Sequence, residues 1–365
     1  MRSCCRCRLV GKPERIDTQN QKEHRLRSVI YFFKRLIHKN IPVYRFLYTL
    51  RTFNLNYCRQ KLAIGQYPSK FGGMWTDRKD YPAKLASRLE AGAVKADMEP
   101  LLEQWREQGF LILEKAISDD LIDRYLDEVA QLKARAPSPL LVTAATLKEP
   151  APYNEQLVAA QHSVRTVDDY YFSEASRRIL MHKGVMDFIE LVFEDKPILN
   201  QGLSFQHGSQ QQVHQDTLFV RMNAPMQLAA IWVALEDITP GSGELVYYPG
   251  SHRWEGFLFS GCFKHYDEER DGPEQLQQWQ QWLQQEAERR QSELIPFLPR
   301  KGDVLIWHAG LAHGGARVTR PDSSRLSLVG HYCPESVRPL YYYYKPAQRR
   351  RYDYGDYRYS TSYYR

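Results

Sequence analysis

The run VHQDTLFV, residues 213–220, carries a histidine and an aspartate two positions apart in an otherwise strand-like stretch. In a strand, residues i and i+2 point to the same face of the sheet. His214 and Asp216 can therefore reach one ion together, while Gln215 points to the other face. On its own this spacing is more typical of two polar residues on the solvent face of a sheet. A metal site needs support from the rest of the chain.

Short strand-like segments separated by Gly and Pro turns surround this run from about residue 198 onward. Regular short strands with turns between them favour a sandwich or a barrel. A helical insertion rich in Gln and Glu, at about 272–292, interrupts the series, and we expect an exposed surface helix there. The strand-like segments are LNQGLSFQH (199–207), QQVHQDTLFV (211–220), QLAAIWVALED (227–237), GELVYYPGSH (243–252), DVLIWHAG (303–310) and RLSLVGHYCP (325–334).

The residues upstream of these strands have mainly helical patterns. Residues 99–133 predict a helix, the short buried strand GFLIL (109–113) and a second helix that has Ser118 as its N-cap. Residues 174–194 also have apolar positions at helical spacing. The chain is therefore expected to be an α+β protein in which helices flank a β core.

A second histidine and an arginine follow the HQD run in the segment GDVLIWHAGLAHGGARVTRPDSSRLSLVGHY (302–332). His313 would complete a set of two histidines and one carboxylate, which leaves coordination positions open at Fe(II). Arg325, twelve residues later, is the residue type that pairs with a carboxylate through two hydrogen bonds. Together these residues fit a site for iron and a chelating 2-oxoacid.

Five segments in this order and spacing resemble the phytanoyl-CoA dioxygenase family of Fe(II)- and 2-oxoglutarate-dependent oxygenases. The resemblance covers residues ~105 to ~335 and includes the GFLIL strand. It implies a double-stranded β-helix (jelly-roll, cupin-like) core. The segments are HQD (214–216), IWVALEDIT (231–239), GELVYYPGSH (243–252), WHAGLAHGG (307–315) and RLSLVGHY (325–332).

The resemblance also implies roles for individual residues. His214, Asp216 and His313 would hold iron, and Arg325 would bind the C5 carboxylate of 2-oxoglutarate. Trp232 matches a tryptophan beside the co-substrate. Two further matched positions near the site, Gln215 and His308, are expected to support it rather than to bind the metal.

The chain departs from the family pattern at two places. His313-Gly314-Gly315 stands where many members have HGS, so one serine hydroxyl toward the co-substrate is absent. A family lysine upstream of the HxD has no clear counterpart, and we expect Gln211 or Gln212 to replace it as a polar contact. Because Asp216 is present, and halogenases of the family have a small residue there, hydroxylation is favoured over halogenation.

Charge and composition divide the chain into three parts. The net charge of +7 is the balance of +11 over residues 1–60, −8 over 61–340 and +4 over 341–365. We therefore predict a basic, partly helical N-terminal extension (1–95), an oxygenase domain (96–340) and a low-complexity Tyr/Arg tail (341–365). The acidic middle argues against an enzyme that acts on nucleic acid.

The two ends leave alternatives open. Residues 25–51, basic and rich in aromatic residues, fit either a helix packed on the body or peripheral contact with an anionic membrane surface. The tail has ten tyrosines in 25 residues, and we expect it to be disordered or loosely docked. Cys4, Cys5 and Cys7 have no downstream Cys/His pair that would complete a zinc site, and free thiols fit a cytoplasmic protein.

The sequence therefore predicts a dioxygenase that uses Fe(II) and 2-oxoglutarate, hydroxylates a small organic or lipid-type substrate and releases succinate and CO2. A lipid-linked substrate and an acyl-CoA both fit this prediction, although the sequence has no CoA-specific signature. Two alternatives remain: a non-catalytic, cupin-like binding protein for metal or ligand, and a membrane-associated adaptor that acts through its basic ends.

Overall fold

The computed structural model describes residues 64–364, apart from residues 145, 148, 160–162, 262 and 341–349. The predictions for residues 25–51 and for Cys4, Cys5 and Cys7 lie outside the described residues. Within the described ranges, no helix has both the length and the apolar character needed to cross a membrane.

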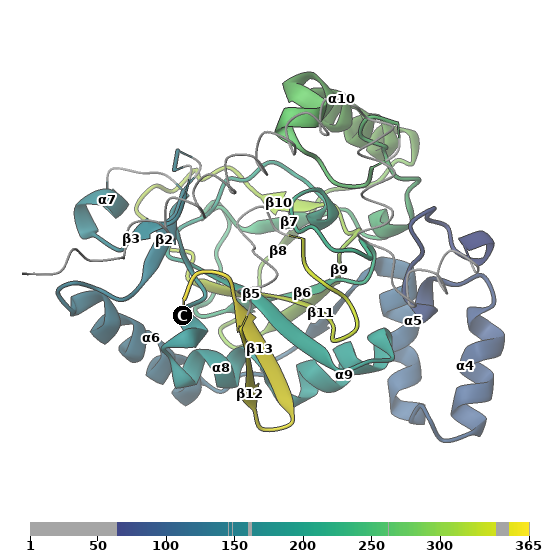
Figure 1. The fold of residues 1–365 in the computed structure, drawn as a ribbon, viewed down its shortest axis with the longest axis horizontal. Coiled ribbons are helices and arrows are strands. Elements are labelled where there is room, and N and C mark those ends of the chain that lie inside the picture. The colour runs from purple at the N-terminus through teal and green to yellow at the C-terminus, as the bar shows by residue number, and fades with distance from the viewer. Residues whose placement is uncertain are drawn as a thin grey trace, which may run out of the picture. The chain divides into compact units, whose positions relative to one another are not determined.

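A large, mainly antiparallel sheet forms the framework, in the order β1-β9-β6-β11-β5-β4-β2-β3 (Figure 1). Every residue of its central strands β6, β9 and β11 is buried. A strand buried on both faces must be covered by other elements on both sides. In sheet order the strands are β1 (Phe110–Leu113), β9 (Val304–His308), β6 (Ala229–Ala234), β11 (Ser327–Pro334), β5 (Pro197–Phe205), β4 (Arg165–Val167), β2 (Leu141–Thr143) and β3 (Ala151–Pro152).

A second, three-stranded antiparallel sheet covers one face of the large sheet. Its order is β10 (His313–Gly315), β7 (Leu245–Tyr247) and β8 (Ile295–Phe297). Alternate residues of β6, among them Ala230 and Trp232, share one hydrophobic cluster with Leu245 of β7 and Phe297 of β8. The two sheets therefore enclose a common core.

Helices cover the other face, where Ile231 and Val233 of β6 belong to a second, larger cluster. The helices predicted over 99–133 and 174–194 are confirmed, although the latter is two helices separated at Met181–His182. Ser118 is at the N-cap position of its helix, but its hydroxyl makes no capping hydrogen bond. The helices are α4 (Tyr81–Glu90), α5 (Glu99–Gln108), α6 (Asp119–Ala134), α7 (Glu155–Ala159), α8 (Glu174–Leu180), α9 (Lys183–Phe193) and α10 (Glu268–Arg289), the last interrupted at Gly272.

Residues 350–364 are ordered where the sequence predicts disorder or loose docking, whereas residues 341–349 of the predicted tail lie outside the described residues. β12 (Arg350–Tyr354) and β13 (Tyr357–Thr361) form a hairpin, and β13 also pairs in parallel with β5. Thr361 Oγ1 donates to the buried carboxylate of Asp168 at 2.6 Å, and Tyr170 Oη donates to Ser360 O at 2.6 Å. The prediction fails here because Tyr and Thr favour strands when a neighbouring strand is available to pair with them.

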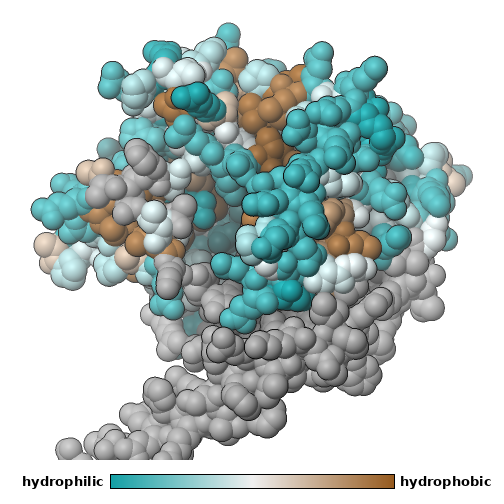
Figure 2. Space-filling view, turned by 90° about the horizontal axis from the view of Figure 1, so that it is seen from above, coloured by the Kyte–Doolittle hydropathy of each residue, from teal (hydrophilic) through white to brown (hydrophobic). Residues whose placement is uncertain are grey.

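The fold is therefore a mixed helical and antiparallel-sheet architecture, with one core between two sheets and another under the helices. On the face shown in Figure 2, the described surface is largely hydrophilic with smaller hydrophobic patches.

Candidate metal centre

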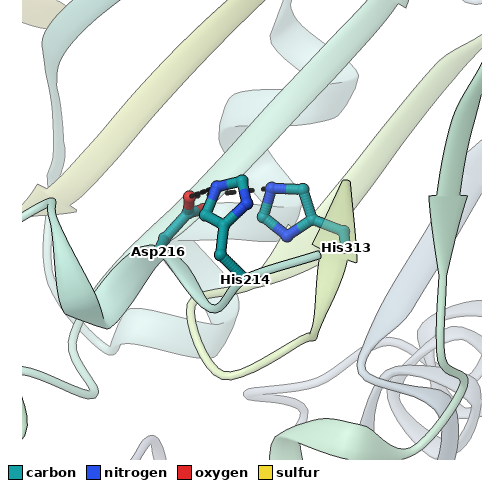
Figure 3. Close-up of side chains that lie close together, drawn as sticks. All are labelled: His214, Asp216 and His313. Carbon is teal, nitrogen blue, oxygen red and sulfur yellow. Dashed lines mark ion pairs between the residues drawn. The ribbon is translucent and has the colours of Figure 1, made fainter. Parts of the chain in front are cut away.

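His214 and His313 lie opposite each other because their backbones exchange two hydrogen bonds. His214 N donates to His313 O at 2.7 Å, and His313 N donates to His214 O at 2.8 Å, in an isolated antiparallel bridge. Asp216 begins a 3₁₀ turn, η5 (Asp216–Leu218), so the strand predicted through residue 220 is wrong beyond the bridge. The two side chains nevertheless point to the same place, as the i, i+2 spacing predicts (Figure 3).

The three side chains converge on one point (Figure 3). Asp216 Oδ1 lies 3.8 Å from His214 Nε2 and 3.7 Å from His313 Nε2. Metal bonds to imidazole nitrogen and carboxylate oxygen are roughly 2.0–2.2 Å long, so one ion can bridge atoms separated by these distances. The arrangement therefore fits a metal ion.

The tautomers of both histidines also suit metal binding. His214 Nδ1 lies 2.9 Å from Gln212 O, and His313 Nδ1 lies 3.0 Å from Leu311 O. A carbonyl oxygen can only accept, so each Nδ1 must carry the proton and donate. Each Nε2 then keeps its lone pair toward the common point, as in metal-binding histidines generally.

The charge states of His214 and Asp216 agree with this role. Burial and the nearby His313 lower the pKa of His214 to about 4, which keeps the ring neutral near pH 7. Burial alone would raise the pKa of Asp216, but the neighbouring histidines hold it below its usual range. Trp307 Nε1 donates to Asp216 Oδ2 at 2.8 Å and so fixes the carboxylate with Oδ1 toward the histidines.

The triad lines a cavity of about 490 Å³ that also contains Arg325 and Trp232. Arg325 is only 3% exposed, and among the described residues its Nε has no hydrogen-bond partner. Its guanidinium lies 5.5 Å from the Trp232 ring and 5.3 Å from the Phe205 ring. Burial lowers the pKa of Arg325 to about 10, so it still carries its charge near pH 7. A buried cation with an unused donor fits a carboxylate ligand.

The three glutamines for which the sequence predicts a role near the site differ in where they lie. Gln211 lines the cavity, and its Nε2 is 3.3 Å from His214 Nε2. Gln212 is exposed and bonds Gln280 instead. Gln215 is not among the cavity-lining residues: its amide bonds Gly310 O and Lys264 Nζ. In this arrangement both ends of the Gln215 amide are therefore engaged outside the cavity.

His308, predicted as a supporting residue, lies outside the cavity. It is fully buried, and its Nε2 is 3.3 Å from Asp77 Oδ2. His308 follows Trp307 on β9, so the two side chains leave opposite faces of the strand. Trp307 reaches Asp216, whereas His308 reaches the region of Asp77.

Arg165 and Tyr363 line the cavity although the sequence analysis predicts no role for either. Arg165 of β4 lines the cavity, and its Nε also lacks a partner among the described residues. It lines the same cavity as His214, and its charge contributes to lowering the pKa of His214. Tyr363, beyond the C-terminal hairpin, also lines the cavity. Arg165 lies well upstream of residues 206–212 and faces the cavity only because β4 pairs with β5, at Arg165–Phe205. The sequence before His214 therefore contains no local signal for it.

The chain is similar to several known proteins at low sequence identity. The peroxisomal phytanoyl-CoA dioxygenase of Rattus norvegicus is 23% identical over 245 residues, which span 62% of this chain and 66% of the rat protein. EctD from S. alaskensis with bound Fe is 19% identical with a TM-score of 0.49, covering 67% of this chain and 79% of that one. The epimerase SnoN in complex with Fe3+, alpha ketoglutarate and nogalamycin RO is 18% identical with a TM-score of 0.48. The match covers 67% of this chain and 87% of SnoN.

The family model described as phytanoyl-CoA dioxygenase (PhyH) matches residues 105–326. This range is more than half of the 365 residues and contains His214, Asp216, His313 and Arg325. The chain belongs to the phytanoyl-CoA dioxygenase family.

Proposed function

We propose that this chain is an Fe(II)- and 2-oxoglutarate-dependent dioxygenase that hydroxylates a small organic substrate. One observation carries the proposal: a His/Asp/His triad and a buried, incompletely bonded guanidinium line the same cavity. The common core of the two sheets supports a double-stranded β-helix as its scaffold. His214, Asp216 and His313 would hold the iron, and Asp216 favours hydroxylation over halogenation.

Iron and 2-oxoglutarate, when bound, supply the oxidising chemistry: one oxygen atom of O2 enters succinate as CO2 is released, and the other enters a C–H bond of the substrate. The chain's own residues bind and orient. Arg325 holds the distal carboxylate of 2-oxoglutarate, with Trp232 and Phe205 against its guanidinium. Trp307 keeps Asp216 oriented toward the histidines.

Arg165 is proposed as the second cationic contact of the site. It fills the role for which the sequence suggested Gln211 or Gln212, because its guanidinium lines the cavity and acts electrostatically on His214. Gln211 would be a neutral polar contact beside His214.

The rest of the cavity wall supports a substrate with an apolar part. Phe219 lines the cavity close to His214, with the ring centroids 5.7 Å apart, and is 45% exposed. Leu147, Pro150 and Tyr363 also line it. An exposed aromatic residue at a binding site is typical of contact with an apolar group. The proposed substrate class includes acyl-CoA and lipid-linked compounds. We also propose a cytoplasmic location, with peripheral membrane contact through residues 25–51.

Calorimetric titration of 2-oxoglutarate tests the binding part of this function. With Mn(II) in place of Fe(II), which prevents turnover, 2-oxoglutarate is expected to bind one site per chain with a Kd in the micromolar range. Without metal the affinity should fall by about tenfold or more, because the oxoacid loses its chelating partner while Arg325 remains. Binding that does not depend on metal would contradict the proposed site.

A further inference from the structure

We propose that Lys264 is a positioning residue for the metal centre, acting through Gln215 on the two chain segments that carry the ligands. The inference rests on the proposed metal site, but not on the identity of the substrate. Neither Lys264 nor Gln215 is among the residues that line the cavity of the triad.

Gln215 links the two ligand-bearing segments directly. It stands between His214 and Asp216, is 1% exposed, and its Nε2 donates to Gly310 O at 2.7 Å. Gly310 precedes His313 by three residues in the loop that leads to β10. The side-chain amide of Gln215 therefore ties the segment that carries two ligands to the loop that leads to the third.

The loop is fixed on its other side by His308. Gly310 N donates to His308 Nδ1 at 2.9 Å, so His308 carries its proton on Nε2 and can donate to Asp77 Oδ2, 3.3 Å away. Asp77 Oδ2 also accepts from Met74 N at 2.7 Å. A continuous series of hydrogen bonds thus runs from Lys264 through Gln215, Gly310 and His308 to Asp77.

Lys264 orients the Gln215 amide at the start of this series. Its Nζ donates to Gln215 Oε1 at 3.2 Å, which leaves Nε2 as the end that faces Gly310. Lys264 is 5% exposed, and no carboxylate of the described residues forms an ion pair with it. A lysine buried without an acidic partner is rare and unfavourable for folding, and an apolar side chain of similar volume often stabilises such a site. The amine is therefore explained by the need of Gln215 Oε1 for a donor.

This explanation predicts opposite effects on folding and on metal binding. In Lys264→Met the buried charge is gone, so the apo protein should melt at the wild-type temperature or above it. The Gln215 amide is free to turn, and the affinity for Mn(II), measured by electron paramagnetic resonance, should fall roughly 10- to 100-fold, as on loss of other outer-shell partners. A residue that only stabilised the fold would not separate the two measurements in this way.

Two further variants and a control complete the experiment. Gln215→Leu should show the same loss of Mn(II) affinity, and adding Lys264→Met to it should cause little further loss, because both act through one amide. Gln215→Leu alone also serves as the second variant if Lys264→Met does not fold. Lys133→Met replaces a partly buried lysine that contacts Tyr153, and should leave the Mn(II) affinity within twofold of the wild type.

The outcomes distinguish this inference from the proposed function. Wild-type Mn(II) affinity in folded Lys264→Met or Gln215→Leu, or fully additive losses in the double variant, would overturn the positioning role while leaving the metal site intact. A wild-type chain that does not bind Mn(II) would overturn the metal site itself, and the positioning role with it.

Discussion

Replacing Arg325 with methionine is expected to weaken 2-oxoglutarate binding to the Mn(II)-loaded chain by at least about 30-fold. Arg325 is buried with an unused Nε donor, so it is ready to form a charge-assisted pair with a carboxylate. Removing one partner of such a buried pair costs about 2 kcal/mol or more, which corresponds to roughly 30-fold in affinity. Methionine keeps the apolar contact with Trp232 and Phe205 but supplies no charge.

The measurement is calorimetric titration of 2-oxoglutarate, with Mn(II) affinity determined on the same samples. Mn(II) affinity should stay within about threefold of the wild type, because Arg325 is not a metal ligand. Arg320→Met is the matched control: this arginine is exposed and bonds Thr239 Oγ1, so its loss should leave both affinities unchanged. Equal 2-oxoglutarate affinity in Arg325→Met and Arg320→Met would refute the role assigned to Arg325.

Replacing His214 with alanine is expected to reduce Mn(II) affinity by more than about 100-fold, beyond the roughly 10- to 100-fold lost with an outer-shell partner. His214 offers Nε2 to the ion because Nδ1 is held by Gln212 O and burial keeps the ring neutral. The variant retains one histidine and one carboxylate, which is too few protein ligands for a facial triad. Binding of 2-oxoglutarate should weaken with it, since the oxoacid chelates the metal.

Mn(II) binding by electron paramagnetic resonance and thermal unfolding of the apo protein check this second prediction together. His207→Ala is the control, because His207 is exposed and its ring Nδ1 lies 3.4 Å from Ser323 O. The expected pattern is wild-type metal affinity in His207→Ala and none measurable in His214→Ala, with both variants folded. Tight Mn(II) binding in folded His214→Ala would place the metal elsewhere.

The sequence predicts that His214, Asp216 and His313 lie together, partly from local spacing and partly from the order of the segments that carry them. The spacing of His214 and Asp216 puts both side chains on one side of the backbone, and this holds although the structure has a bridge and a 3₁₀ turn there. His313 is then brought opposite His214 by two backbone hydrogen bonds. The resemblance to a family supplied the pairing of these distant segments, which spacing alone could not.

What the sequence could not predict depends on contacts between distant segments. Arg165 faces the cavity because β4 pairs with β5, and Tyr363 reaches it because β13 is added beside β5. No local pattern encodes these pairings, and the low complexity of the tail favoured disorder instead. The contacts of Gln215 could not be predicted for the same reason: its partners, Lys264 and Gly310, are 49 and 95 residues away.

Succinate formation is the most direct test of the central claim. The purified full-length chain, given Fe(II), dioxygen and 2-oxoglutarate, is expected to release succinate above the His214→Ala blank, and a metabolite panel should contain compounds that stimulate the rate. The adaptor alternative makes no such prediction. A wild-type chain that binds Mn(II) and 2-oxoglutarate yet forms no succinate above the blank with any compound would contradict the account and favour a non-catalytic binding protein.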